Sequence, residues 1–180
     1  VAEQAGSGLL QLHARVVDVQ EFNTSIQATD NKSETHFMAY GEVLARLGGA
    51  APKGAHLVAD RCGGRQRYQR SLRKLFPGQR VDVEQEHPVR STYRIGGPDG
   101  IRVTFAAGGE EQCFATALAS CVAKYTRQML MAAFNRWFLE RVPGLKPTAG
   151  YYTDGRRFLK DLAPHLESIG IGPSRLMRLR

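Results

Sequence analysis

Two acidic side chains of this chain stand where a strand of a sheet is expected to end. Asp60 directly follows the apolar run at residues 56–59, and Glu110 follows Gly108-Gly109 at the exit of a second run. Functional groups of open α/β sheets gather at the carboxyl ends of strands. Carboxylate oxygens at such an edge suit Mg²⁺ or Mn²⁺. The sequence therefore indicates a metal site, although Asp60 could instead cap a turn and Glu110 could instead stabilise a helix N-terminus.

Polar and aromatic residues that could bind a polyanion follow the second carboxylate. Lys124, Thr126 and Arg127 interrupt an apolar helix, and Lys124 and Arg127 share one face because they are three residues apart. Tyr151 follows Gly150 in a loop, where an aromatic ring could stack on a base or a sugar. The structural alternatives are the solvated face of a core helix for the three polar residues and a loop anchor for Tyr151.

The net charge favours the same kind of partner. The 180 residues carry 25 Lys and Arg against 17 Asp and Glu, which gives a net charge of +8. Such an excess predicts attraction to polyanions, with nucleic acid ahead of an anionic membrane surface. The segment 61–74 is basic and has no acid, and either phosphate contacts or a solvated face would explain it. Its basic residues are Arg61, Arg65, Arg67, Arg70, Arg73 and Lys74.

The cysteines and the apolar runs indicate the cellular setting. The three cysteines, Cys62, Cys113 and Cys121, have no zinc-ligand spacing, and we interpret them as the thiols of a reducing compartment. No apolar run approaches the roughly 18 residues that a membrane span needs. We therefore expect a cytoplasmic protein without membrane contact.

Alternating strand and helix patterns predict an α/β fold that positions these residues. Strands are expected over residues 9–19, 56–59, 81–83, 90–95 and 101–106, and the last two form a hairpin around the Gly-Gly-Pro-Asp-Gly turn at residues 96–100. Helices are expected over residues 33–47, 65–75, 112–139 and 154–166. In the longest helix, the spacing predicts a buried apolar side made of Phe114, Leu118, Val122, Met129, Ala133 and Trp137.

These pieces resemble the type 2 ribonuclease H family, which comprises ribonucleases HII and HIII. In that family an apolar strand ends in a catalytic Asp, as at Val58-Ala59-Asp60, and a second strand ends in Gly-Asp, similar to Gly109-Glu110. Ten residues later comes the serine of an Ala-Ser-Ile-x-Ala-Lys-x-Thr-Arg helix, and residues 119–127 read Ala-Ser-Cys-Val-Ala-Lys-Tyr-Thr-Arg. Gly150-Tyr151-Tyr152-Thr153 resembles the family's Gly-Tyr-x-Thr, and Glu21-Phe22-Asn23 resembles its acidic-apolar-Asn step.

The chain departs from the family pattern in four ways, one of which is a long stretch between the two carboxylates that includes the hairpin around residues 96–100. Glu110 replaces the family's second Asp, and Gln128 replaces the Asp of its Thr-Arg-Asp sequence. The family's Gly-x-Asp-Glu-x-Gly strand, which supplies two further acids, has no counterpart here. The resemblance therefore implies a single ribonuclease H-like domain over residues 1–180, N-terminally truncated, whose mixed sheet is flanked by helices and lacks its first strands. Residues 79–109 would be a hairpin insertion.

The resemblance also implies an activity. The parent protein would hydrolyse RNA endonucleolytically in RNA–DNA hybrids by a two-metal mechanism, and the isolated chain would be inactive. Asp60 and Glu110 would be the catalytic residues of this chain, as ligands of Mg²⁺ or Mn²⁺.

The remaining residues of the motif would bind the substrate. Lys124, Thr126 and Arg127 would contact phosphates, and Tyr151 would stack on the sugar of the ribonucleotide. The partner would be an RNA–DNA hybrid, or DNA with embedded ribonucleotides, bound by a monomer. Two other interpretations stay open, a non-catalytic nucleic-acid-binding domain on the same fold and an unrelated basic α/β domain.

Overall fold

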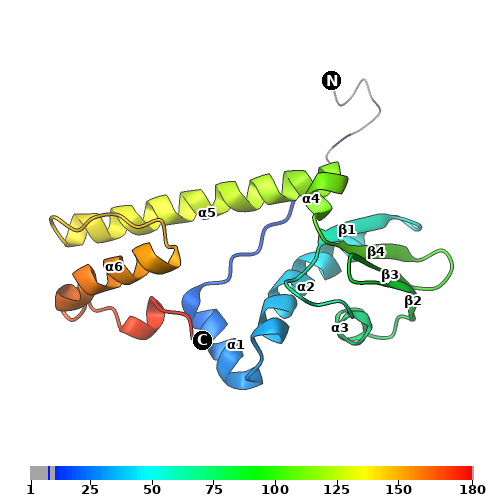
Figure 1. Cartoon of the computed structure of the whole chain (residues 1–180), viewed down its shortest axis with the longest axis horizontal. Coiled ribbons are helices and arrows are strands. Elements are labelled where there is room, and N and C mark those ends of the chain that lie inside the picture. Colours follow the sequence, from blue (N-terminus) through cyan, green and yellow to red (C-terminus); the bar gives the residue numbers. More distant parts are fainter. Residues whose placement is uncertain (1–7, 9–10, 180) are drawn as a thin grey trace. The chain divides into compact units, whose positions relative to one another are not determined.

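A computed structural model of the chain describes residue 8 and residues 11–179 (Figure 1). The chain forms two compact units. Unit 1 comprises Val1–Val16 and Asn31–Ala119, and unit 2 comprises Val17–Asp30 and Ser120–Arg180. Each unit has its own hydrophobic core, so each is described by itself.

Unit 1 contains a four-stranded mixed sheet with the strand order β1-β4-β3-β2 (Figure 1). Strand β1 (His56–Asp60) pairs in parallel with β4 (Ile101–Ala106). Strands β2 (Val81–Glu86), β3 (Arg90–Ile95) and β4 form an antiparallel meander. The predicted α/β class, with a mixed sheet flanked by helices, is therefore confirmed, and the predicted hairpin joins β3 to β4.

Helices α2 (Lys32–Ala50) and α3 (Gln69–Leu75) cover one face of this sheet. Alternate residues of β3 and β4, such as Tyr93 and Phe105, point into the core that they share with Phe37 of α2 and Leu72 of α3. The ring of Tyr68, just before α3, stacks on Phe105 with centroids 3.7 Å apart. A short helix, α4 (Gly109–Gln112), follows β4.

Unit 2 is helical. It comprises α1 (Val19–Thr29), most of the long helix α5 (Phe114–Arg141), α6 (Tyr152–Leu162) and the 3-10 turns η1 (Ala163–His165) and η2 (Pro173–Arg175). Its core residues are Phe138, Val142, Leu145, Phe158 and Leu162. The buried Asn23 joins α1 to the end of the chain, because its amide donates to the carbonyls of Ser174 and Met177 and its oxygen accepts from the Leu179 N–H.

Two predicted elements are wrong. Leu9 and Leu10, which begin the predicted strand 9–19, lie outside the described residues, and residues 11–18 form no strand. Val19 instead begins α1, because the Asp18 carboxylate accepts from the Glu21 N–H and caps a helix. The apolar side predicted for the long helix is also wrong, since Phe114 and Met129 are 84% and 54% exposed.

Other predicted boundaries move by a few residues. The helix predicted over 65–75 begins at Gln69, because the Tyr68 N–H donates to the Tyr93 hydroxyl and holds the preceding residues in a loop. The last helix runs from Tyr152 to Leu162 and gives way to a 3-10 turn at Pro164, which cannot donate a helical hydrogen bond.

Candidate functional site

The parallel pairing of β1 and β4 brings the carboxyl ends of both strands to one edge of the sheet. Asp60 lies opposite Ala106, and the Arg61 N–H donates to the Ala106 carbonyl at 2.9 Å. The chain leaves β4 through Gly108, whose φ of 63° is left-handed, and α4 begins at Gly109. The Gly109 N–H donates to Asp60 Oδ1 at 3.1 Å. The structure therefore places the Asp60 carboxylate next to the residue that precedes Glu110.

Gly109 packs closely against the end of β1. A Cβ at this position would lie 3.3 Å from the Ala59 carbonyl oxygen and 3.4 Å from Asp60 Cα. The first contact is tighter than most real Cβ contacts, the second is at the limit of ordinary van der Waals contact, and both atoms belong to the backbone. The Gly-Glu sequence at 109–110 thus lets α4 start in close contact with the end of β1.

Asp60 and Glu110 are both exposed, and Glu110 lies in the first turn of α4. Their carboxylate oxygens are hard donors of the kind that Mg²⁺ and Mn²⁺ prefer. Among residue 8 and residues 11–179, no group of three or more His, Cys, Asp or Glu side chains is arranged to hold a metal. The described residues thus offer a pair of acids at this edge, which fits part of a divalent-metal ligand set.

The start of α5 is tied to the same edge of the sheet. Thr116 Oγ1 donates to the Val58 carbonyl at 3.0 Å. Cys113 occupies the position before α5, and hydrogen bonds from Thr116 and the Ala115 N–H lower the pKa of its thiol. By contrast, burial raises the pKa of the Cys62 thiol to about 11. The hydrogen bond from Thr116 to Val58 fixes the position of the segment between Glu110 and the start of α5.

The polar residues predicted on the long helix lie on α5 within unit 2. Lys124 and Arg127 are exposed, and Thr126 is half-buried. The Arg127 guanidinium lies over the Tyr151 ring, with Cζ 4.6 Å from the ring centroid, and its Nη2 donates to the Ala149 carbonyl at 2.6 Å. The structure thus brings Arg127 and Tyr151 into contact. The asparagine of the Glu21-Phe22-Asn23 step has the structural role described above.

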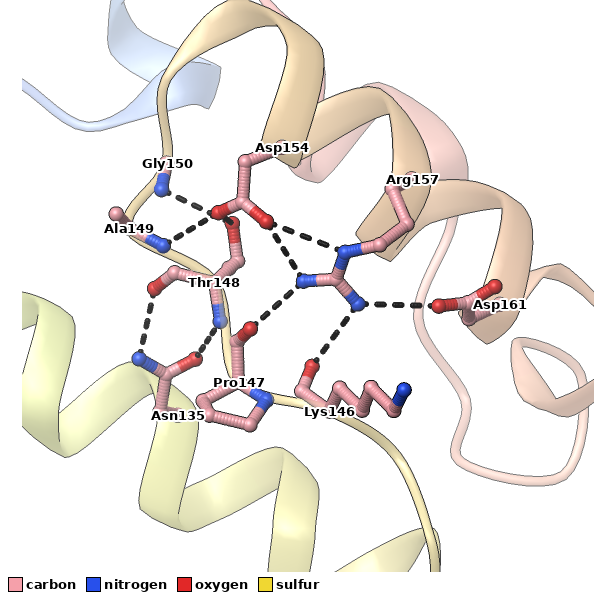
Figure 2. Close-up of polar contacts among 9 residues, drawn as sticks. All are labelled: Asn135, Lys146, Pro147, Thr148, Ala149, Gly150, Asp154, Arg157 and Asp161. Atoms are coloured by element: carbon pink, nitrogen blue, oxygen red, sulfur yellow. Dashed lines mark hydrogen bonds and ion pairs between the residues drawn. The ribbon is translucent and has the colours of Figure 1, made fainter.

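A hydrogen-bond network holds the loop that carries Tyr151 (Figure 2). Asp154 Oδ2 accepts from the Thr148 hydroxyl and from the Ala149 N–H, each at 2.6 Å. Asn135 of α5 binds the Thr148 backbone twice, donating to its carbonyl at 2.8 Å and accepting from its N–H at 2.9 Å. Arg157 joins the other oxygen of Asp154 at 2.8 Å. The loop is therefore held from both α5 and α6.

The charge state of Asp154 follows from these contacts. Hydrogen bonds from Thr148, Arg157 and the Ala149 N–H lower its pKa to about 2, from 3.8. Arg157 also donates to the Pro147 carbonyl at 2.7 Å and to Asp161 at 3.0 Å. Sequence reasoning missed this network, and its signals were the spacing of three residues from Asp154 to Arg157 and of four from Arg157 to Asp161.

The basic segment 61–74 has largely intramolecular contacts. The Arg65 guanidinium lies 4.7 Å from the Phe37 ring centroid and pairs with Glu34 at 3.3 Å. Lys74 pairs with the same carboxylate at 2.9 Å, and Arg61 donates to the Pro88 carbonyl. These residues therefore stabilise the packing of unit 1.

Comparison with known proteins finds no relative, so a function can be proposed only from the residues of the chain itself. No family model matches the chain, and no curated protein or solved structure matches it either. Within residue 8 and residues 11–179, none of the helices has the length and apolar composition that crossing a membrane requires.

Proposed function

We propose that this chain belongs to an endonuclease that hydrolyses RNA in RNA–DNA hybrids, with a type 2 ribonuclease H-like fold. The single observation that carries the proposal is the hydrogen bond from the Gly109 N–H to Asp60 at the shared end of β1 and β4. It joins the two short motifs that resemble that family, the second of which also has the family's ten-residue spacing to the serine of the helix at residues 119–127.

Asp60 and Glu110 would hold Mg²⁺ or Mn²⁺. The metal would supply activation of water and stabilisation of the leaving oxygen. The contribution of the chain itself is orientation. The Gly109 N–H donates to Oδ1 of Asp60 and so favours an orientation that leaves Oδ2 available to a ligand.

Unit 2 would bind the substrate. Lys124 and Arg127 would attract phosphates, with Thr126 as a further polar contact, and Tyr151 would lie against a ribose whose 2′-hydroxyl distinguishes RNA from DNA. The contact between Arg127 and Tyr151 supports this proposal, since it combines a cation and an exposed ring on one surface.

The test measures cleavage of a labelled RNA–DNA hybrid in Mg²⁺ and in Mn²⁺. It uses the protein as its complete gene encodes it. We expect that Asp60→Asn abolishes cleavage while the fold is retained. The matched control is Asp99→Asn, which changes an exposed acid in the β3–β4 turn of the same unit and should leave the rate unchanged. Equal loss of activity in both variants, or cleavage that survives Asp60→Asn, would contradict the proposal.

A second candidate function is binding of nucleic acid without cleavage on the same fold. The surface formed by Arg127 and Tyr151 favours it, because this surface needs no metal to bind a polyanion. Hybrid binding that weakens with salt, together with no cleavage that depends on Asp60, would establish this function instead. Absence of binding at low salt would favour an unrelated basic domain.

A further inference from the structure

Tyr152 and Arg156 form a second pair of ring and guanidinium, next in sequence to that of Tyr151. Tyr152 begins α6 and Arg156 lies one helical turn later, so the two side chains share a face. Arg156 Cζ is 5.6 Å from the Tyr152 ring centroid, and its Nη1 donates to the Tyr152 hydroxyl at 3.2 Å. Two consecutive tyrosines therefore each contact an arginine of unit 2.

Both rings remain accessible. Tyr151 and Tyr152 expose 67% and 64% of their surface. An arginine contacts each ring, and more than half of the surface of each tyrosine still faces solvent. Exposed aromatic rings accompanied by arginine are the surfaces on which proteins stack the bases of single-stranded nucleic acids.

Hydrogen bonds hold the loop that precedes the two rings. Gly150 ends this loop with a φ of 73°, a left-handed conformation that favours glycine. Asp154 and Thr148 hold the adjacent loop, as Figure 2 shows. These hydrogen bonds reduce the conformational entropy that the loop would lose on ligand binding.

The charge of this region matches a phosphodiester backbone. Between residues 124 and 161 the acids are Glu140, Asp154 and Asp161, and Arg157 pairs with the last two. The basic residues of the same segment are Lys124, Arg127, Arg136, Arg141, Lys146, Arg156, Arg157 and Lys160.

From these observations we propose that Tyr152 and Arg156 bind an unpaired nucleotide next to the nucleotide at Tyr151. Bases inside a duplex already stack on their neighbours, so a protein ring can stack only on a base that is unpaired or splayed out. The inference rests on the proposed function and narrows its substrate to a hybrid that continues into a single strand.

The experiment measures binding of the full chain, in EDTA, to a short blunt RNA–DNA hybrid and to the same hybrid with an unpaired extension. Fluorescence anisotropy gives both dissociation constants. We expect the extended hybrid to bind about tenfold more tightly, because stacking on one ring contributes a factor of this order. Tyr152→Ala should reduce this preference to about twofold or less.

Two control variants separate stacking from folding and charge. Tyr152→Phe retains the ring and should keep the preference. Tyr125→Ala removes a tyrosine of α5 that is also 64% exposed, and it should keep the preference as well. Fluorescence of Trp137, the single tryptophan of the chain, reports whether unit 2 of each variant is folded.

The outcomes separate this inference from the proposed function. Equal binding of both hybrids by the unmodified chain, or the same preference in Tyr152→Ala, would overturn the inference. If such a result accompanied hybrid cleavage that is lost in Asp60→Asn, only the inference would fail and the nuclease proposal would stand. A stacking preference lost in Tyr152→Ala, without any cleavage, would support the inference within a binding protein.

Discussion

Unit 1 and unit 2 hold their candidate functional residues by different physical means. In unit 1 the backbone does so, because the β1–β4 register places Asp60 and the Gly109 N–H orients its carboxylate. In unit 2 side chains do so, because Asp154 and Asn135 hold the loop before Tyr151. The first arrangement should be sensitive to added volume, and the second to changes in charge.

The largest expected effect concerns the carboxylate of unit 1. Glu110→Gln should lower hybrid cleavage by at least about 100-fold, because a neutral amide binds a divalent cation much less strongly and metal catalysis contributes several kcal/mol. Glu110→Asp, which retains the charge, should keep measurable activity. Initial rates in Mg²⁺ test both variants, and equal rates for both would show that the charge at residue 110 is not used.

The backbone contact itself can be broken by a single methyl group. Gly109→Ala should destabilise unit 1 by about 1–3 kcal/mol, since its Cβ would press on backbone atoms of residues 59 and 60. Urea unfolding followed by circular dichroism measures the change, and Trp137 fluorescence follows unit 2 separately. Gly49→Ala is the control, because nothing lies within 4 Å of its added Cβ within α2. That variant should be neutral or up to about 1 kcal/mol more stable, and a similar loss in both variants would refute the steric argument.

The side-chain network of unit 2 should respond to pH. The pKa of Asp154 is about 2 in the folded chain against 3.8 ordinarily, so its stabilising contribution is complete above pH 3.8 and disappears as the pH falls through 2. Thermal unfolding by Trp137 fluorescence should show an advantage over Asp154→Asn that disappears across this window. Asp161→Asn, which removes the other carboxylate partner of Arg157, should show a smaller loss. An advantage over Asp154→Asn that is constant with pH would contradict this account.

The smallest expected effect is on binding. Arg127→Gln should weaken hybrid binding a few-fold and lower the slope of log affinity against log salt by about 1, as expected for one phosphate contact. The control is Arg141→Gln, which makes the same change of charge at a different position of α5. There Arg141 Cζ lies 4.0 Å from the Trp137 ring centroid. If both variants changed the slope equally, net charge rather than a specific contact would explain binding.

The sequence predicted unit 1 better than unit 2, and the reason is physical. The strand ending at Asp60 and the β3–β4 hairpin depend on local signals, namely alternation, chain direction and turn glycines. The buried side of α5 depends on what covers it. Apolar spacing grouped Phe114 with Met129, whereas the buried contacts of this helix are made by residues such as Phe138 against α6.

The candidate site shows the same division. The spacing from Glu110 to Arg127 could be compared with a known family. The position of Asp60 at the end of β1 was predictable from the apolar run before it, whereas Glu110 lies in the first turn of α4 and not at the end of β4. The network of Asp154 could not be predicted, because it needs Asn135 and Thr148, thirteen residues apart, to face each other. Only the folded path of the loop between α5 and α6 brings them together.

The hydrogen bonds of Asn23 to residues 174, 177 and 179 have a consequence for the order in which the two units can fold. All of the chain that forms unit 1 has been synthesised once Ala119 emerges from the ribosome. The α1 segment emerges much earlier, yet the carbonyls that Asn23 binds belong to Ser174 and Met177. Since domains fold as units during synthesis, unit 1 can fold first, while α1 is secured only after residues 174–179 have been made.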